Sequence, residues 1–297
     1  MAVAWVQREQ PWFIVTTRGV YIYHYEHFPS LQVCHRLAYA SIAMNTVREL
    51  ARSVLSAQHT QAKVASTRIA HTHLSALSPL LLGPSLPLSL SPPPSSLVLP
   101  LQRLPVQHSN KEVSLLHALA HIEYNAINLY WDMLGRFELP NVPREYYTDF
   151  ASVALDEADH LEALEKRLQV LGCGYGQLGV HNGLMAGLEA SSSSVLDRIA
   201  LTALVHEARA LDSRQRLISK LNSFNGDKES ARLLEWIVNC EVKHVRIGLK
   251  WFRHFAGNAG KQRFQETVKR LVGRLRPPFD HTSRAEAGFP RDWYEGN

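Results

Sequence analysis

The sequence predicts an all-α protein built on a four-helix bundle, and two observations lead to this prediction. From Lys111 onward the residue pattern is strongly helical. The expected helices are joined as two antiparallel pairs by short turns, with a longer glycine-rich crossover between the pairs. We therefore expect a bundle over residues 106–297, with a fifth helix and a tail at its C-terminal end.

The N-terminal third divides into three expected segments. Residues 1–45 are predicted to be an irregular extension, in which Phe13–Thr17 and Val20–Tyr23 form a short hairpin. Residues 46–73 are predicted to form one amphipathic helix that packs against the bundle. The apolar residues of this helix that recur at spacings of three and four are Val47, Leu50, Ala51, Val54 and Leu55.

Residues 74–105 are rich in Leu, Ser and Pro, and no acidic or basic residue lies between Arg68 and Arg103. An apolar stretch of this length could be a membrane span or a linker. The repeated prolines favour a linker, because each one removes a helix hydrogen bond that lipid cannot replace. We expect a disordered, polyproline-leaning linker and no membrane segment.

The bundle helices are delimited by prolines, glycines and capping residues. Pro143 is a good first-turn residue, glycines from Gly172 onward end the second helix, and the run that ends at Ser194 supplies an N-cap. Asn225–Asp227 is a predicted turn, and the last twenty residues are expected to be irregular. The expected helices are Lys111–Phe137, Pro143–Leu171, a short one over His181–Glu189, then 195–222, Lys228–Phe255 and Gly260–Leu275.

Composition places the chain among globular proteins of a reducing compartment. Hydrophobic residues make up 45% of the 297 residues, and three cysteines without a CxxC pair support no disulfide framework. The first thirty residues lack a secretory pattern, so a cytoplasmic location is expected. Much of the net charge of +5 lies in Lys261–Arg276, which is either a solvated helix face or a contact surface for nucleic acid or phosphate.

One motif occurs twice: a lone glutamate is followed by a Glu-x-x-His pair that begins 34 residues later. A Glu and a His three residues apart lie on one helix face, so both can reach the same interior point. A single such pair is usually a surface feature, but the doubled motif on four helices is the ligand set of a two-metal bundle site. The six expected ligands are Glu123, Glu157, His160, Glu207, Glu241 and His244.

The chemistry of these ligands predicts the kind of metal. Carboxylates bridge two ions, a neutral imidazole binds each ion, and oxygen and nitrogen ligands with open positions suit iron or manganese. We therefore expect two iron ions, with manganese as the alternative. Without metal, four buried acids would repel one another and shift toward protonation.

Three further residues are expected near the site. Tyr130, seven residues after Glu123, would either hydrogen-bond a ligand or pack in the core. Asp156 lies one turn before His160 and is predicted to orient its ring, whereas Cys240 takes the matching position before His244. Arg214 would either balance acidic charge or form a surface ion pair.

Gly248, seven residues after Glu241, would leave room for oxygen or substrate, or would permit close helix packing. His117 and His121 stand four apart without the glutamate of an HExxH motif, so they are not a metalloprotease signature.

The motifs resemble DUF455, a ferritin-like family catalogued only as a domain of unknown function. The resemblance covers about Lys111–Phe289, and the helix at Val47–Ala70 resembles the family's N-terminal segment. It implies a ferritin-like bundle with the six motif residues as di-metal ligands. Asp159 stands where the resemblance leads us to expect an arginine. The matching motifs are Leu116–Glu123, Asp156–His160, Glu207–Asp212, Glu241–His244, Tyr175–Gly176, His181–Leu184, and the tail from Pro278–Phe279 to Ala287–Phe289.

These expectations lead to one main function and several alternatives. The main hypothesis is a di-iron oxidase or hydroxylase that activates oxygen and attacks an unidentified small-molecule or macromolecular substrate. The alternatives are an iron-handling protein and a non-catalytic helical scaffold. Related ferritin-like groups include a tRNA hydroxylase, so a nucleic-acid substrate is a further alternative that rests on analogy and on the basic run.

Overall fold

The computed structural model describes residues 12–16, 19–23, 44–84, 109–181, 183–224 and 228–295. The chain divides into two compact units, Met1–Met44 and Asn45–Asn297. In the first unit, β1 (Trp12–Thr16) and β2 (Gly19–Tyr23) pair in antiparallel fashion, with Trp12 opposite Tyr23. The predicted hairpin is therefore confirmed, one residue from its expected bounds.

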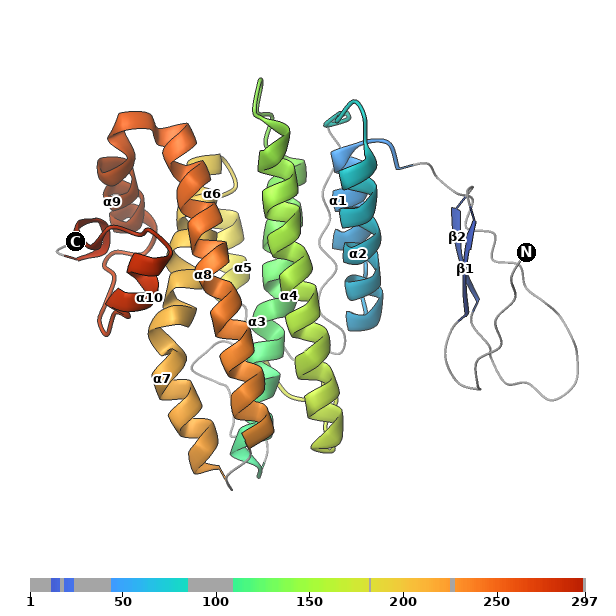
Figure 1. The fold of residues 1–297 in the computed structure, drawn as a ribbon, viewed down its shortest axis with the longest axis vertical. Helices are drawn as coiled ribbons and strands as arrows, with labels where there is room; N and C mark the ends of the chain where they lie inside the picture. The colour runs from blue at the N-terminus through green and yellow to red at the C-terminus, as the bar shows by residue number, and fades with distance from the viewer. Residues whose placement is uncertain are drawn as a thin grey trace, which may run out of the picture. The chain divides into compact units, whose positions relative to one another are not determined.

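The second unit is all-α, as the sequence predicts (Figure 1). Four long helical segments form its centre: α3 (Lys111–Arg136), α4 (Arg144–Val170), the segment that ends in α7 (Glu207–Ser223), and α8 (Lys228–Ala256). α3 packs against α4, and α7 packs against α8, which also contacts α4. These are the two expected helix pairs. No helix in the described residues is long and apolar enough to cross a bilayer.

The segment that leads into α7 is not a uniform α-helix. It begins with α6 (Val195–Ile199), continues as a π-helical stretch, η2 (Ala200–His206), and becomes α-helical again at Glu207. Ser194 caps its start, since its side chain accepts a hydrogen bond from the amide of Asp197. The crossover before it contains α5 (Gly183–Ala190), which matches the short helix that the sequence predicts.

The packing helix expected over residues 46–73 is two helices, α1 (Val47–Leu55) and α2 (Thr60–Ala76). The buried Lys63 of α2 holds the end of α1 at this break, since its Nζ donates to the carbonyl of Val54 at 2.8 Å and to Oδ1 of Asn128 at 2.7 Å. A main-chain carbonyl at the end of α1 thus gains a partner. α1 packs on α3 and α2 on α4, so both belong to the helical unit.

The predicted linker begins later than residue 74. Leu74 is fully buried within α2, and the amide of Val47 donates to the carbonyl of Leu81 at 2.9 Å. Residues up to Pro84 are therefore part of the fold. Residues 85–108, which include most of the predicted linker, and the predicted turn at Asn225–Asp227 lie outside the described residues.

The C-terminal tail is helical and docked, so the prediction of an irregular tail is wrong. After η3 (Gly257–Ala259) and α9 (Gly260–Leu271) come α10 (His281–Glu286) and α11 (Arg291–Tyr294). Arg284 of α10 is buried and donates two hydrogen bonds, of 2.8 and 2.7 Å, to the carboxylate of Asp212 in α7. Contacts between residues this far apart in sequence are not visible in local composition.

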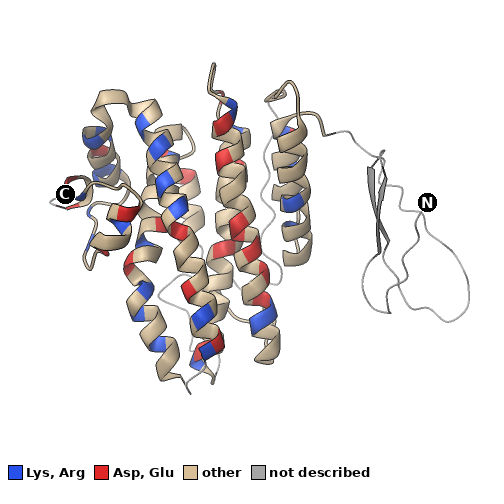
Figure 2. Ribbon diagram, viewed as in Figure 1, with Lys and Arg blue, Asp and Glu red and all other residues tan. Residues whose placement is uncertain are grey.

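The predicted basic helix is α9. Lys261 donates to Asp292 at 2.8 Å, and Arg270 donates to Asp197 at 2.6 Å. Both of these cations are therefore paired within the chain. Basic residues also lie along α8, whereas acidic residues are prominent on α4 (Figure 2).

Candidate metal centre

Six buried side chains from all four long helical segments meet in the middle of the bundle. Each is at most 8% exposed. Helix α3 presents one glutamate, α4 a Glu and His pair, α7 one glutamate at its first residue, and α8 the second pair. They are the residues that the sequence singles out: Glu123, Glu157, His160, Glu207, Glu241 and His244.

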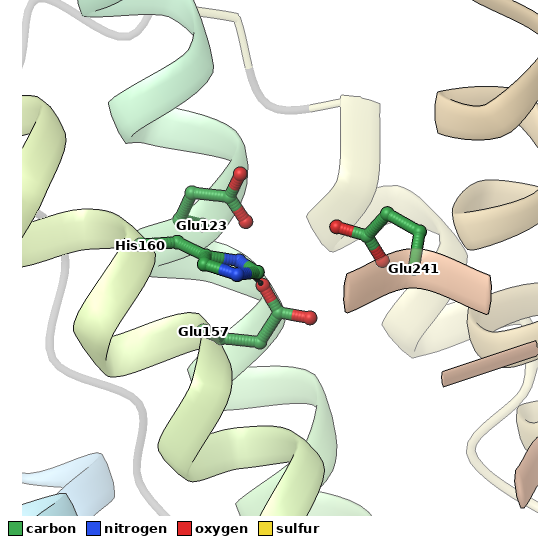
Figure 3. Close-up of side chains that lie close together, drawn as sticks. All are labelled: Glu123, Glu157, His160 and Glu241. Carbon is green, nitrogen blue, oxygen red and sulfur yellow. Dashed lines mark hydrogen bonds and ion pairs between the residues drawn. The ribbon is translucent and has the colours of Figure 1, made fainter. Parts of the chain in front are cut away.

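The ligand atoms form two overlapping groups, each with all its atoms within 4.8 Å of one another. One group contains Glu123 and His160, and the other contains Glu207 and His244. Glu157 and Glu241 belong to both groups. Figure 3 shows the first group, with carboxylates from α3, α4 and α8 directed toward a common point. Each of the two groups could hold a metal ion, and one glutamate of each Glu-x-x-His pair is common to both.

In the metal-free cluster, four buried carboxyl groups lie close together, and the pKa values of three of them are shifted. Burial raises the pKa of Glu123 and of Glu207 well above the usual value, and the neighbouring carboxylates raise it further. Burial also acts to raise the pKa of Glu157, but His244 and His160 lower it well below the usual value. In the metal-free cluster, protons on Glu123 and Glu207 therefore take the place of the positive charge that a bound cation would supply.

The chain's similarity to known proteins agrees with the extent of the helical unit. A family model described as a protein of unknown function, DUF455, matches residues 47–295. The chain belongs to the DUF455 family. The DUF455 match begins at the first residue of α1 and ends just after α11, so the family includes the two packing helices and the docked tail.

One curated relative of this DUF455 chain is an "Uncharacterized protein" of Haemophilus influenzae. It is 32% identical over 191 residues, which span 60% of this chain and 66% of the relative. No solved structure matches the chain.

Tyr130 hydrogen-bonds a predicted ligand. Its hydroxyl donates to Oε1 of Glu207 at 2.6 Å, and its ring stacks on Phe150. Burial and the carboxylates, with Glu207 foremost among them, raise the pKa of Tyr130 well above its usual value. The phenol is therefore a neutral donor, which is the first of the two roles that the sequence leaves open.

Asp156 orients a histidine, but not the one in its own helix. Its Oδ2 lies 3.1 Å from Nε2 of His244 on α8, and the ammonium of Lys243 donates to the same oxygen at 2.6 Å. The prediction that it orients His160 is wrong, because its side chain crosses to the neighbouring helix. Two turns earlier on α4, Asp149 repeats the pattern with Lys250 and the indole nitrogen of Trp251, at 2.6 and 2.8 Å.

Arg214 lies away from the cluster. It donates to Glu235 at 3.3 Å, and the side chains of this pair are 28% and 55% exposed. It forms the surface ion pair, which is the second role that the sequence leaves open. Asp159, which replaces an expected arginine, pairs with Arg68 of α2 at 2.6 Å.

Gly248 permits close packing between α8 and the π-helical stretch. A Cβ on Gly248 would overlap the Cβ of Ala203 and would lie 3.3 Å from a methyl group of Leu204. No room for oxygen or substrate exists at this position. The contact matters for the site, because η2 ends directly before Glu207.

Sequence reasoning did not find the residues that hold the crossover against α3. Nε2 of His117 accepts a 2.8 Å hydrogen bond from the amide of Gly176. One turn later, Nδ1 of His121 lies 2.8 Å from the hydroxyl of Tyr175, and Nε2 lies 3.0 Å from the carbonyl of His181. The four-residue spacing of His117 and His121, which places both on one face of a helix, was the sequence feature that could have indicated this contact. Both histidines hydrogen-bond the crossover.

Proposed function

We propose that this protein is a ferritin-like di-iron carboxylate protein, with manganese as an alternative metal, that uses oxygen to oxidise a substrate. The observation that carries the proposal is the overlap of the two ligand groups, which share Glu157 and Glu241. Two ions at these positions would each have one histidine, one glutamate of their own and two shared carboxylates. Helical bundles use this ligand set for paired iron or manganese ions.

The residues fit such a pair of ions in chemistry and in charge. Carboxylate oxygen and imidazole nitrogen suit iron and manganese, and four carboxylates would balance two divalent ions. Nδ1 of His244 lies 2.8 Å from Oε2 of Glu241, and Nδ1 of His160 lies 3.2 Å from Oε2 of Glu157. The Nδ1 atoms therefore face the acids and are the nitrogens that would bind metal.

The surrounding residues prepare these ligands in three ways. Tyr130 donates to Glu207, which fixes one carboxylate oxygen and leaves the other for a cation. Asp156 accepts from Nε2 of His244, so the proton of a neutral ring stays on the outer nitrogen and Nδ1 is free. Burial of all six residues keeps bulk water from the acids. Iron, when bound, would supply the activation of oxygen and the oxidation of a C–H bond.

The proposal is tested by loading the metal-free protein with ferrous iron under anaerobic conditions and measuring oxygen consumption after mixing with air-saturated buffer. We expect rapid consumption that is stoichiometric with iron and faster than that of free ferrous iron. The Glu157→Ala, Glu241→Ala double variant should lose the reaction, and Asp159→Asn, on the same helix as Glu157, should retain it. Oxygen consumption no faster than in buffer would leave the scaffold alternative. Light scattering from large iron-filled assemblies would favour iron storage instead.

A further inference from the structure

The two halves of the cluster differ in what lies behind each histidine. Behind His244 is a carboxylate: Asp156 Oδ2 lies 3.1 Å from Nε2, the nitrogen that points away from the acids. The ammonium of Lys243 donates to the same oxygen at 2.6 Å, so Asp156 is also the partner of a cation. An ionised carboxylate can only accept, so Nε2 of His244 is a donor and the ring is held in one orientation.

Behind His160 the corresponding group is a thiol. Nε2 of His160 is buried and has no carboxylate partner within the described part of the chain, and the side chain of Cys240 is its weak hydrogen-bonding neighbour. The edge of Trp236 closes the same side, with ring centroids 4.9 Å apart. Compared with a carboxylate, the sulfur of a cysteine is a weak acceptor for the outer N–H.

The partners are exchanged between the halves. Asp156 stands four residues before His160 but contacts His244, whereas Cys240 stands four residues before His244 but contacts His160. The position four residues before each histidine of the repeated motif therefore contacts the histidine of the other half. In one copy this position holds an aspartate, and in the other a half-buried cysteine.

This difference has a consequence for binding of a cation. A carboxylate that accepts from the outer N–H of an imidazole makes the inner nitrogen a better ligand, and loss of such a partner costs about 10–100-fold in metal affinity. His160 lacks this support. The ligands themselves do not offset the difference, because each group consists of three glutamates and one histidine.

We propose that the two metal positions are unequal, so that the position at His244, supported by Asp156, fills first and the position at His160, next to Cys240, binds more weakly. The inference rests on the proposed two-metal function. It assigns positioning roles to Asp156 and Cys240. It also gives the protein a stable state with one bound ion, to which the second ion binds reversibly.

The test is an anaerobic titration of the metal-free protein with Co²⁺, in which binding is measured by calorimetry and by visible absorption. Wild type should show two steps whose affinities differ by about tenfold or more. Asp156→Asn should weaken the tighter step by about 10–100-fold and leave the weaker one unchanged. Cys240→Asp should strengthen the weaker step, so that the two merge. Asp159→Asn is the control on the same helix, because Asp159 pairs with Arg68 and should leave both steps unchanged.

A second variant keeps the test valid if Cys240→Asp does not fold. Asp156→Cys gives both halves a thiol and should yield two equal, weak steps. Circular dichroism of each metal-free variant separates a folding defect from a binding defect. Two equal steps in wild type, or an equal effect of Asp156→Asn on both, would overturn this inference while leaving two metals in place. Absence of any binding in folded wild type would contradict the proposed function itself.

Discussion

Tyr130 and Glu207, from opposite pairs of the bundle, are joined by a 2.6 Å hydrogen bond in which the phenol donates to the carboxylate. Both residues are buried. The bond therefore links the first half of the repeated motif to a predicted ligand of the second half.

Removal of this donor should alter the site without unfolding the bundle. Tyr130→Phe keeps the ring that stacks on Phe150 and removes only the hydroxyl. We expect metal affinity or oxidation rate to fall by about 10–100-fold, because Glu207 loses the group that orients it. Calorimetric metal titration measures the effect. An affinity and a rate equal to those of wild type would show that the hydrogen bond is incidental.

The close approach of α8 to the π-helical stretch should not tolerate a methyl group. Gly248→Ala should destabilise the protein by about 1–3 kcal/mol through overlap with Ala203, despite the better helix propensity of alanine. Denaturant unfolding gives the value. Adding Ala203→Gly should recover part of the loss, with a coupling of about 1 kcal/mol in the double-mutant cycle. Unchanged or increased stability of Gly248→Ala would contradict the packing described.

Acid should weaken the contact between the crossover and α3. Burial lowers the pKa of His117 from 6.5 to about 4, with His121 adding a smaller effect. The unfolded chain therefore binds the extra proton first, and the stability contributed by neutral His117 is lost as pH falls from 6.5 toward 4.

At full loss this contribution is roughly 3 kcal/mol. His117→Gln retains an acceptor but cannot titrate, so its unfolding free energy should fall less than that of wild type over this pH range. Parallel pH profiles for the two proteins would show that His117 is not the responsible group.

Replacing glutamate by glutamine should change the stability of the metal-free protein little at some positions of the cluster and strongly at another. Glu123 and Glu207 have a raised pKa, so Gln resembles their protonated state. The Glu123→Gln, Glu207→Gln double variant should lose metal but keep its metal-free stability within about 1 kcal/mol.

Glu157 has a lowered pKa because of His244 and His160, which act against burial, and it lies between both histidines. Glu157→Gln should therefore destabilise the metal-free protein by about 3–5 kcal/mol, because buried cations lose their partner. Thermal unfolding with chelator present compares the two. Equal effects would contradict this assignment of protons.

The clustering of the six predicted residues could be foreseen because much of it depends on local geometry. The three-residue spacing of Glu157 and His160 places both on one helix face whatever the rest of the chain does. The partner of Asp156 was not predictable in this way, since the choice between His160 and His244 depends on how α4 and α8 are packed.

Other features also depend on contacts between distant segments. The contact of Lys63 in α2 with the end of α1 and the pair of Arg284 with Asp212 are set by tertiary packing, and neither has a local sequence signal. The π-helical stretch before Glu207 likewise contains no residue that marks it. These are the places where the predicted single N-terminal helix and irregular tail were wrong.

The most direct measurement of the central claim is metal content. The protein is purified anaerobically with iron supplied, and metal per chain is determined by mass spectrometry beside the Glu157→Ala, Glu241→Ala variant and the Asp159→Asn control. We predict about two ions per chain in wild type and control, and none in the double variant. Folded wild-type protein that contains no iron or manganese would contradict the two-metal account.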